Sequence, residues 1–198
     1  KTPLSVLKLV MDEKVAGSDL EGHANRAVSN INAIVNRCLQ LGKLDTKAIE
    51  LNPEWLNADE FTDALLQDYQ AGARVDARVS QDLLIYADRE VLRVIVANLL
   101  ENALKYAPAK SIIRIDMKCF RKGDSDGVAI TVLNAMGPMG APDAEQVFKK
   151  YYRNSQATKI SGSGLGLFLV NELINVMGGN ATYKANQEKV IFSLWIPT

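Results

Sequence analysis

The residues best suited to chemistry are two asparagines and a lysine at helical spacing. Asn98 and Asn102 stand four residues apart, and Lys105 follows three residues later in the stretch 94–108. Residues at these spacings share one face of a helix. Amide oxygens can ligate a hard cation such as Mg²⁺ or its waters, and an ammonium group can meet phosphate as a point charge. The face therefore suits a magnesium polyphosphate, although a solvated polar face explains the three residues equally well.

The stretch that carries these side chains has the pattern of an amphipathic helix. Apolar residues recur at steps of three and four, which places them on one face. Asp88 is a suitable N-cap, and Pro108 follows the expected end of the helix. The apolar face consists of Leu92, Ile95, Leu99, Ala103 and Tyr106.

A glycine-rich segment at 162–167, Gly-Ser-Gly-Leu-Gly-Leu, is a second candidate for ligand binding. It ends a long irregular stretch and opens a predicted helix over 164–177. Glycines let a backbone approach a ligand, and the first-turn N–H groups of a helix attract anions. The segment does not directly follow a strand, as a dinucleotide-binding turn would, and it lacks the Gly-Lys-Ser/Thr of a P-loop. A flexible helix entry is the alternative interpretation.

Two further segments combine polar or aromatic side chains with a turn. In the segment 148–153, aromatic residues precede Arg153, which is consistent with a pinned loop whose arginine reaches a phosphate. Asn134 ends a predicted strand and is followed by Gly137 and Gly140, an arrangement found at ligand-binding edges. A small hydrophobic cluster and a plain turn are the alternative interpretations.

The elements around these segments predict an α+β domain. Most strands have a sequence neighbour with which they can pair antiparallel, and the helices would cover one face of the sheet. A short helical patch is expected at 145–152, inside an irregular stretch over 134–163. Strands are predicted at 49–51, 74–79, 83–86, 111–120, 128–133, 181–184 and 190–196, with a further helix from residue 57 or 59 to about 71.

The first 45 residues or so have a different pattern. From Leu20 to Leu41, apolar residues alternate at steps of four and three, the heptad spacing of helical bundles. A shorter apolar stripe runs from Leu4 to Met11, and Gly17 lies between the two stripes. So short a hairpin cannot bury both stripes alone. We therefore expect it to pair with a second copy into a four-helix bundle.

Bulk composition narrows the classes of partner. Lys plus Arg equals Asp plus Glu, at 23 each, which gives no support for nucleic-acid or anionic-membrane binding driven by net charge. No apolar run approaches the roughly 20 residues of a membrane span. Cys38 and Cys119 fit no metal or redox spacing, and each falls in an apolar pattern. We expect both thiols to be buried, in a reducing compartment.

The order of the motifs resembles the ATP-binding domain of bacterial sensor histidine kinases, which share an ATPase superfamily with DNA gyrase and the Hsp90 chaperones. The resemblance covers Ile49 to the end of the chain. The first residues, Lys-Thr-Pro-Leu, resemble the end of the family's phosphoacceptor motif, and the hairpin resembles its dimerisation and phosphotransfer module. This implies a hairpin domain at 1–46 and an ATP-binding domain at 47–198, an α/β sandwich with a mixed, mostly antiparallel sheet. The motifs that carry the resemblance are Asn-x-x-x-Asn-Ala-x-Lys, a strand-end polar residue with glycines, Phe-x-x-Tyr-Tyr-Arg, and Gly-x-Gly-Leu-Gly-Leu.

The resemblance implies a role for each phosphate-side residue. Asn98 and Asn102 would hold Mg²⁺ on the phosphates of ATP. Lys105 would contact phosphate, and Tyr106 would lie near the nucleotide. Arg153 would approach the γ-phosphate. Asn98, Lys105 and Arg153 would thus be the catalytic residues.

The resemblance also assigns the adenine edge and the hinge. Asn134 stands where the family usually has an aspartate that receives the adenine amino group, and an amide oxygen accepts that hydrogen bond without a charge. Gly137 and Gly140 would line the same edge, in a segment that is irregular against the family's Asp-x-Gly-x-Gly. The lid hinge and the phosphate-facing helix start would consist of Gly162, Gly164, Leu165 and Gly166.

The reaction implied is transfer of the ATP γ-phosphoryl to a histidine and on to a response-regulator aspartate. By the motif, that histidine belongs three residues before Lys1, so this chain is expected to bind ATP without phosphorylating itself. His23, the only histidine, is expected to be an ordinary bundle or surface residue. Thr2 stands where the family often has a residue that helps water attack the phosphorylated regulator, which implies a phosphatase role.

The expected partners are a second copy through the hairpin and a response-regulator receiver domain, with no nucleic acid. A membrane is expected only through a segment upstream, which makes the chain the cytoplasmic portion of a protein anchored in the inner membrane. One alternative is a dimeric signalling adaptor that binds nucleotide weakly. Another is a different ATPase of the superfamily, but these usually place a glutamate base where Asn98 stands and lack the hairpin.

Overall fold

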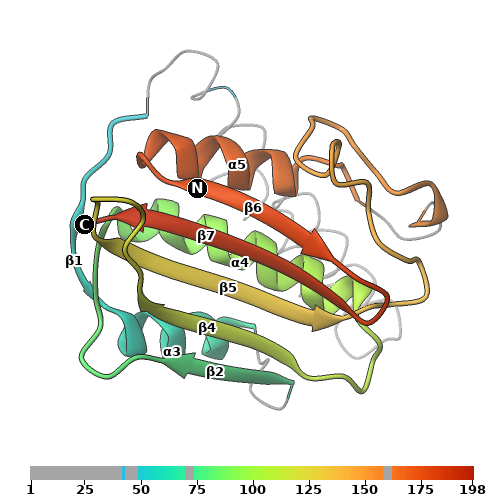
Figure 1. Cartoon of the computed structure of the whole chain (residues 1–198), viewed down its shortest axis with the longest axis horizontal. Coiled ribbons are helices and arrows are strands. Elements are labelled where there is room, and N and C mark those ends of the chain that lie inside the picture. The colour runs from blue at the N-terminus through green and yellow to red at the C-terminus, as the bar shows by residue number, and fades with distance from the viewer. Residues whose placement is uncertain (1–41, 43–48, 70–73, 158–161) are drawn as a thin grey trace, which may run out of the picture. The chain divides into compact units, whose positions relative to one another are not determined.

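The computed structural model describes residues 42, 49–69, 74–157 and 162–198. Residues 50–198 form one structural unit, and Figure 1 draws its described residues in colour. The predicted hairpin lies outside the described residues apart from Gly42, as do Thr2, His23, Cys38 and the predicted boundary between residues 46 and 47. Among the described helices, none combines the length and the apolar character that crossing a bilayer requires.

A five-stranded sheet with the order β2-β4-β5-β7-β6 forms one layer (Figure 1). β2 runs parallel to β4, and every other neighbouring pair is antiparallel, which confirms the predicted mixed sheet. Alternate residues face the helices, so each long strand buries every second side chain. The strands are β2 (Val75–Val79), β4 (Ile113–Cys119), β5 (Gly127–Ala135), β6 (Asn180–Ala185) and β7 (Lys189–Pro197).

Three helices cover one face of this sheet, as the sequence predicts, and Figure 1 shows α4 behind the central strands. α4 begins after Asp88, whose Oδ1 accepts a hydrogen bond from the Val91 N–H at 3.0 Å, and it ends before Pro108. The predicted cap and stop are therefore confirmed. The helices are α3 (Ala58–Asp68), α4 (Arg89–Tyr106) and α5 (Gly166–Val176).

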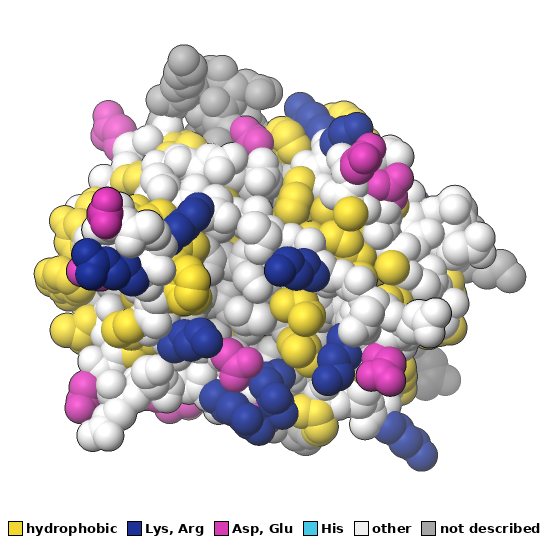
Figure 2. All heavy atoms as spheres, viewed as in Figure 1, with side chains coloured by type: hydrophobic (Ala, Val, Ile, Leu, Met, Phe, Trp, Pro, Cys, Tyr) yellow, Lys and Arg dark blue, Asp and Glu magenta, His cyan; other side chains and the backbone are white. Residues whose placement is uncertain are grey.

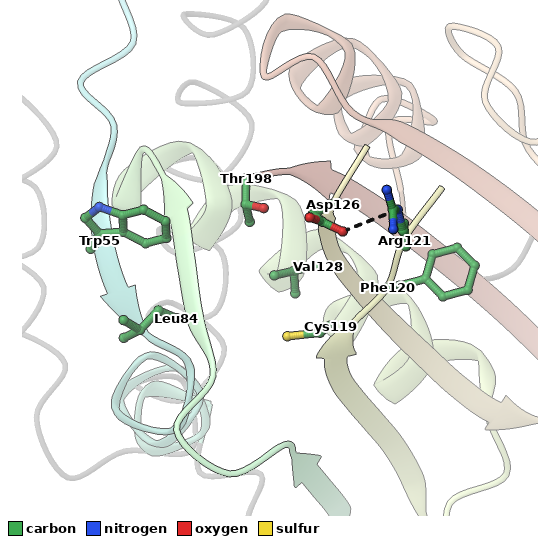
Figure 3. Close-up of a pocket in the computed structure, with 9 residues that line it drawn as sticks. Trp55, Leu84, Cys119, Phe120, Arg121, Asp126, Val128 and Thr198 are labelled. Carbon is green, nitrogen blue, oxygen red and sulfur yellow. Dashed lines mark ion pairs between the residues drawn. The ribbon is translucent and has the colours of Figure 1, made fainter. Parts of the chain in front are cut away.

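A separate two-stranded ribbon pairs β1 (Glu54–Asn57) with β3 (Leu84–Ala87). One face of the ribbon buries Leu56 and Ile85, whereas Trp55 on the other face is 61% exposed and lies 5.1 Å from the ring of Tyr86. A groove of about 360 Å³ separates the ribbon from the β4–β5 hairpin. Figure 3 shows its lining, with Trp55 on one side and Cys119 on the other.

The expected burial of Cys119 is wrong, because this thiol is exposed. By alternation it faces the same way as Met117, which is buried. However, β2 ends at Val79, opposite Met117, and the last residue of β4 extends beyond it to line the groove. The predicted alternation in β4 is therefore correct, but β2 does not extend far enough to cover the last residue of β4.

Two local predictions are also wrong. The strand expected at 49–51 is absent, because the first described strand starts at Glu54. The patch at 145–152 forms turns in place of a helix, and a short helix, η1 (Ser155–Ala157), follows it. Tyr151 has φ +66°, which a right-handed helix does not accommodate. A single helical turn forms after Asp143, where the Val147 N–H donates to the Asp143 carbonyl, but the chain does not continue as a helix.

An aromatic cluster fixes the loop 136–157 against the end of the sheet. Phe148 packs edge-on to Phe192 at 6.1 Å between ring centroids, and Tyr183 lies 5.1 Å from Phe192 on the other side. The Tyr183 hydroxyl donates to the Pro142 carbonyl at 3.1 Å. Burial raises the pKa of Tyr183 to about 12, with a smaller contribution from Tyr152. The loop is thus pinned, as its aromatic residues predict, by two strands distant in sequence.

The cap of α3 gives a stability prediction. The Asn57 side chain accepts hydrogen bonds from the N–H groups of Asp59 and Glu60 at 2.9 and 3.1 Å. We expect Asn57→Ala to lower the free energy of unfolding by about 0.5–2 kcal/mol, because these donors lose their acceptor. Urea denaturation of the full chain measures it. Asp63→Ala, at an exposed position of the same helix, is the control and should stay within about 0.5 kcal/mol of wild type. Equal losses in both variants would contradict the assignment.

The Tyr183 anchor gives a pH prediction. Since its pKa is raised above the ordinary 10 to about 12, its stabilising effect is complete below pH 10 and is lost as the pH rises toward 12. We expect the stability advantage of wild type over Tyr183→Phe to shrink between about pH 9 and about pH 11.5. Urea midpoints at both pH values measure it.

Tyr86→Phe is the matched control, because Tyr86 is exposed and lies on the ribbon away from the loop. It should follow the pH dependence of wild type. A constant difference between wild type and Tyr183→Phe across this pH range would show that the Tyr183 hydroxyl does not titrate as its burial implies.

Candidate functional site

The two helical amides meet the start of α5. Asn98 is 6% exposed, and its Nδ2 donates to the Val94 carbonyl one turn earlier at 2.8 Å. Its Oδ1 is buried and has no hydrogen-bond partner among the described residues. A Cβ atom added to Gly166 would lie 2.9 Å from this oxygen and 3.9 Å from Nδ2 of Asn102. Both amides therefore face the bare backbone of a helix start.

The first turn of α5 offers donors to an anion. Leu165 occupies the N-cap position and makes no side-chain capping bond. The first N–H groups of a helix have no partner within the helix, and they form its positive end. In this fold that end faces the buried oxygen of Asn98, across a position where only glycine leaves room. A cation bound by the amides and an anion bound by the N–H groups would therefore be neighbours.

Lys105 approaches the glycine-rich segment from α4. A Cβ atom on Gly162 would lie 2.8 Å from the Lys105 Nζ. The ammonium is exposed and stands 5.1 Å from the ring centroid of Tyr106. The glycine-rich segment thus touches the predicted face of α4 at two points, Gly162 near Lys105 and Gly166 near Asn98. The sequence predicts the helical face and the glycine-rich segment separately, and the structure shows that the two are in contact.

The end of β5 meets the end of α4. Asn134 is 4% exposed, and its Nδ2 donates to the Ala135 carbonyl at 2.8 Å, which orients the amide. The backbone of Gly137 packs so closely that a Cβ atom there would lie 1.9 Å from the Tyr106 carbonyl oxygen. Gly140 has φ +67° and closes a turn by donating to the Gly137 carbonyl at 3.1 Å. The predicted adenine edge is therefore attached to α4.

The hinge glycine is tied to the aromatic segment. Gly164 has φ +70°, and a Cβ atom there would lie 2.6 Å from the carbonyl carbon of Tyr151. The Tyr151 N–H donates to the Gly164 carbonyl at 3.0 Å. No local sequence pattern indicates this bond, which joins the aromatic segment to the glycine-rich segment.

Arg153 lies in the exposed part of that loop, where its Nη2 donates to the Ala157 carbonyl at 3.2 Å. Its approach to a phosphate stays a prediction.

The donor set fits Mg²⁺ carried on a polyphosphate. No group of three His, Cys, Asp or Glu side chains that could hold a metal exists in the described ranges. A cation here would rely on amide oxygens, waters and the oxygens of its own ligand, and Mg²⁺ commonly keeps several waters and binds substrate phosphates. The unpartnered Oδ1 of Asn98 is an oxygen of this kind. The residues present therefore fit the group that the motifs imply.

Comparison with known sequences identifies a family model and relatives that agree with the resemblance stated from the motifs. The model of the family described as histidine kinase-, DNA gyrase B-, and HSP90-like ATPase matches residues 87–198, more than half of the chain. The sensor protein KdpD of Escherichia coli (strain K12) is 30% identical over 197 residues, which is 92% of this chain and 21% of KdpD. The sensor protein PfeS of Pseudomonas aeruginosa is 26% identical over 203 residues, all of this chain and 44% of PfeS. The chain thus spans less than half the length of either relative.

Solved structures share the fold. The Acinetobacter baumannii histidine kinase AdeS matches with a TM-score of 0.71 and 17% identity over 99% of this chain and 95% of its own. Full-length ShkA in complex with AMPPNP matches with a TM-score of 0.74 and 22% identity, over 98% of this chain and 42% of ShkA. Sequence, family model and fold agree. The chain therefore belongs to the family of histidine kinase-, DNA gyrase B- and HSP90-like ATPases, as a catalytic core of the sensor histidine kinase kind.

Proposed function

We propose that this chain binds Mg²⁺-ATP between α4, α5 and the end of β5, and that it is the core of an ATP-dependent protein histidine kinase. The observation that carries the proposal is the buried, unpartnered Oδ1 of Asn98 facing the bare start of α5 at Gly166. A buried acceptor without a partner costs roughly 1–3 kcal/mol. A bound ion or its water would remove that cost.

Each residue of the phosphate side has a stated task. Asn98 and Asn102 direct amide oxygens at Mg²⁺ or its waters, and Lys105 neutralises phosphate charge. The N–H groups that begin at Gly166 donate hydrogen bonds to phosphate oxygens. Arg153 stabilises the γ-phosphate from the loop. When bound, Mg²⁺-ATP supplies the phosphoryl group, and these residues position it and offset its charge.

The adenine side consists of Asn134, Gly137 and Gly140, with Tyr106 beside them. The amide of Asn134 donates to the Ala135 carbonyl and so keeps Oδ1 as its acceptor for the adenine amino group. Bare backbone at Gly137 lets this edge stay in contact with α4.

Transfer to a histidine suits this site better than hydrolysis. An amide cannot take a proton from water, so Asn98 cannot act as a general base. The acceptor we propose is a histidine three residues upstream of Lys1, followed by a response-regulator aspartate. Thr2 would help water attack the phosphorylated regulator, and His23 would take no part in phosphotransfer.

The wider assembly is part of the same proposal. Residues 1–46 would form the dimerisation hairpin and residues 47–198 the ATP-binding domain. The chain would act as a homodimer and bind a receiver domain on the cytoplasmic side of a protein anchored in the inner membrane. The relatives named above are sensor proteins, which supports this arrangement.

One observation favours a second function, that of a dimeric adaptor which binds nucleotide weakly. Asn134 is neutral, so its hydrogen bond to adenine lacks the charge that strengthens a carboxylate acceptor. Titration with a non-hydrolysable ATP analogue and Mg²⁺ separates the two functions. Absence of binding at about millimolar ligand, which corresponds to only about 4 kcal/mol, would overturn the kinase proposal.

A substitution at Asn102 tests the site directly. We expect Asn102→Ala to weaken Mg²⁺-dependent binding of the ATP analogue more than about tenfold, a loss above 1.4 kcal/mol, because a cation ligand is removed. Calorimetric titration with and without Mg²⁺ measures it.

Asn175→Ala is the matched control, since Asn175 is an exposed amide at the far end of α5. It should leave the affinity unchanged. Urea midpoints of both variants should stay near wild type. If Asn102→Ala binds the Mg²⁺ complex as tightly as wild type, the metal site is misplaced.

A further inference from the structure

The five-stranded sheet has a second face, which the helices described here do not cover (Figure 1). In its middle, β5 and β7 present a strip without charge. Leu133 lies opposite Ile191, and Thr131 lies opposite Ser193, with their hydroxyl oxygens 3.3 Å apart. Ala129 continues the strip. These side chains are small or of moderate size, so a partner can approach the sheet closely along both strands.

Basic residues border the strip on both sides. In register, Arg114 and Lys118 of β4 lie opposite Leu133 and Ala129, and Lys184 of β6 lies opposite Ile191. The chain as a whole has a net charge of zero, so this face concentrates positive charge. Figure 2 looks onto it: much of the middle is white and yellow, one dark blue side chain lies near the centre, and both dark blue and magenta side chains stand around it. Within the strands, the outward basic residues are Arg78, Arg114, Lys118, Lys184 and Lys189, against Asp76 and Asp116.

The two acidic residues offset only part of this excess. Asp116 lies between Arg114 and Lys118 on β4, and Asp76 offsets charge on the neighbouring arginines. Asp76 is already paired, with its Oδ2 at 2.9 Å from Nη2 of Arg78 and 3.3 Å from Nε of Arg114. The hydrogen bond from Arg78 lowers the pKa of Asp76, so this carboxylate stays ionised and committed. Lys118 and Lys184, one on each border, are exposed. Their charges are therefore available to a partner.

The width of the strip fits one helix. Neighbouring strands lie about 4.8 Å apart, so the span from β4 across β5 and β7 to β6 is about 14 Å. An α-helix with its side chains is about 10–12 Å wide. A helix lying along β5 and β7 would place a narrow apolar stripe on Leu133 and Ile191. The two flanks of that helix would then lie over the basic borders of the strip. Acidic side chains on these flanks would be complementary to the basic residues below them.

We propose that this face binds an acidic amphipathic helix of a partner protein, with a narrow apolar stripe flanked on both sides by Asp or Glu. Packing a helix on the open face would complete a three-layer arrangement of a common kind. A second copy of the same face would be repelled by its like charge.

Single-stranded nucleic acid is less suited, because it needs aromatic platforms for its bases. On β7, the outward Trp195 is already engaged, because its Nε1 donates to the Phe120 carbonyl at 3.1 Å and Lys122 Nζ stands 5.1 Å from its ring centroid. An anionic membrane would call for large apolar side chains that can insert, and the strip consists mainly of small ones.

A synthetic peptide tests the proposal. The probe is a helix with a leucine and alanine stripe and glutamate on both flanks, and a scrambled peptide of the same composition is its control. We expect saturable binding of the first peptide alone, with amide chemical-shift changes on the outward residues of β4, β5, β6 and β7. Higher salt should weaken the binding, because exposed charges are screened.

Charge reversal locates the site. Lys118→Glu combined with Lys184→Glu should weaken peptide binding at least about tenfold, because one charge on each border changes sign. The matched control combines Lys110→Glu with Lys149→Glu, two exposed positions away from this face, and should bind as wild type does. Binding of the ATP analogue should persist in the Lys118→Glu and Lys184→Glu variant, so this test is independent of the proposed ATP site.

Three outcomes would overturn the proposal. Equal binding of the scrambled peptide would show that the face recognises only the net charge of the peptide and not its amphipathic pattern. Shifts confined to other surfaces would show that the face is unused. Binding of oligo-thymidylate, or of phosphatidylglycerol vesicles, in place of the peptide and with loss in the Lys118→Glu and Lys184→Glu variant, would assign the face to nucleic acid or to a membrane.

Discussion

The close approach of α4 and α5 at Asn98 and Gly166 is the contact on which the candidate site depends. A buried amide oxygen faces a helix start across a position that has no side chain. Any residue other than glycine would push the two helices apart or displace the amide. The glycine-rich segment therefore has a packing reason as well as a binding one. Gly162 also lies close to α4, but the atom it meets is the exposed Nζ of Lys105, the flexible end of a long side chain, so the constraint there is weaker.

Patterns within one element could be predicted from the sequence, and contacts between distant elements could not. The cap at Asp88 and the spacing of Asn98 and Asn102 depend on local rules, and the fold keeps them. The exposure of Cys119 depends on where β2 ends, which no pattern in β4 records. The turn at Tyr151 depends on a bond to Gly164, across a stretch of loop that periodicity does not describe.

The same limit applies to the site. The sequence separates four motifs, and their order indicates a family, but only the fold brings Asn98 and Gly166 into contact. Conversely, the fold attaches the loop through Tyr183 and Phe192, two residues that no motif contains. Positioning residues of this kind are ordinary strand residues in the sequence. They become recognisable when their cross-strand neighbours and buried hydroxyl groups are known.

The parallel pairing of β2 with β4 has a consequence for how the domain assembles. Asp76 and Arg114 are neighbours in the sheet but 38 residues apart in the chain, with the whole of α4 between them. The strands of the β4–β5 and β6–β7 hairpins are close in sequence, so little chain entropy is lost when they pair. Pairing of β2 with β4 requires closure of a much longer loop. β2 is also an edge strand. We therefore expect it to be among the last strands to dock, and its amide hydrogens to exchange early in the native state.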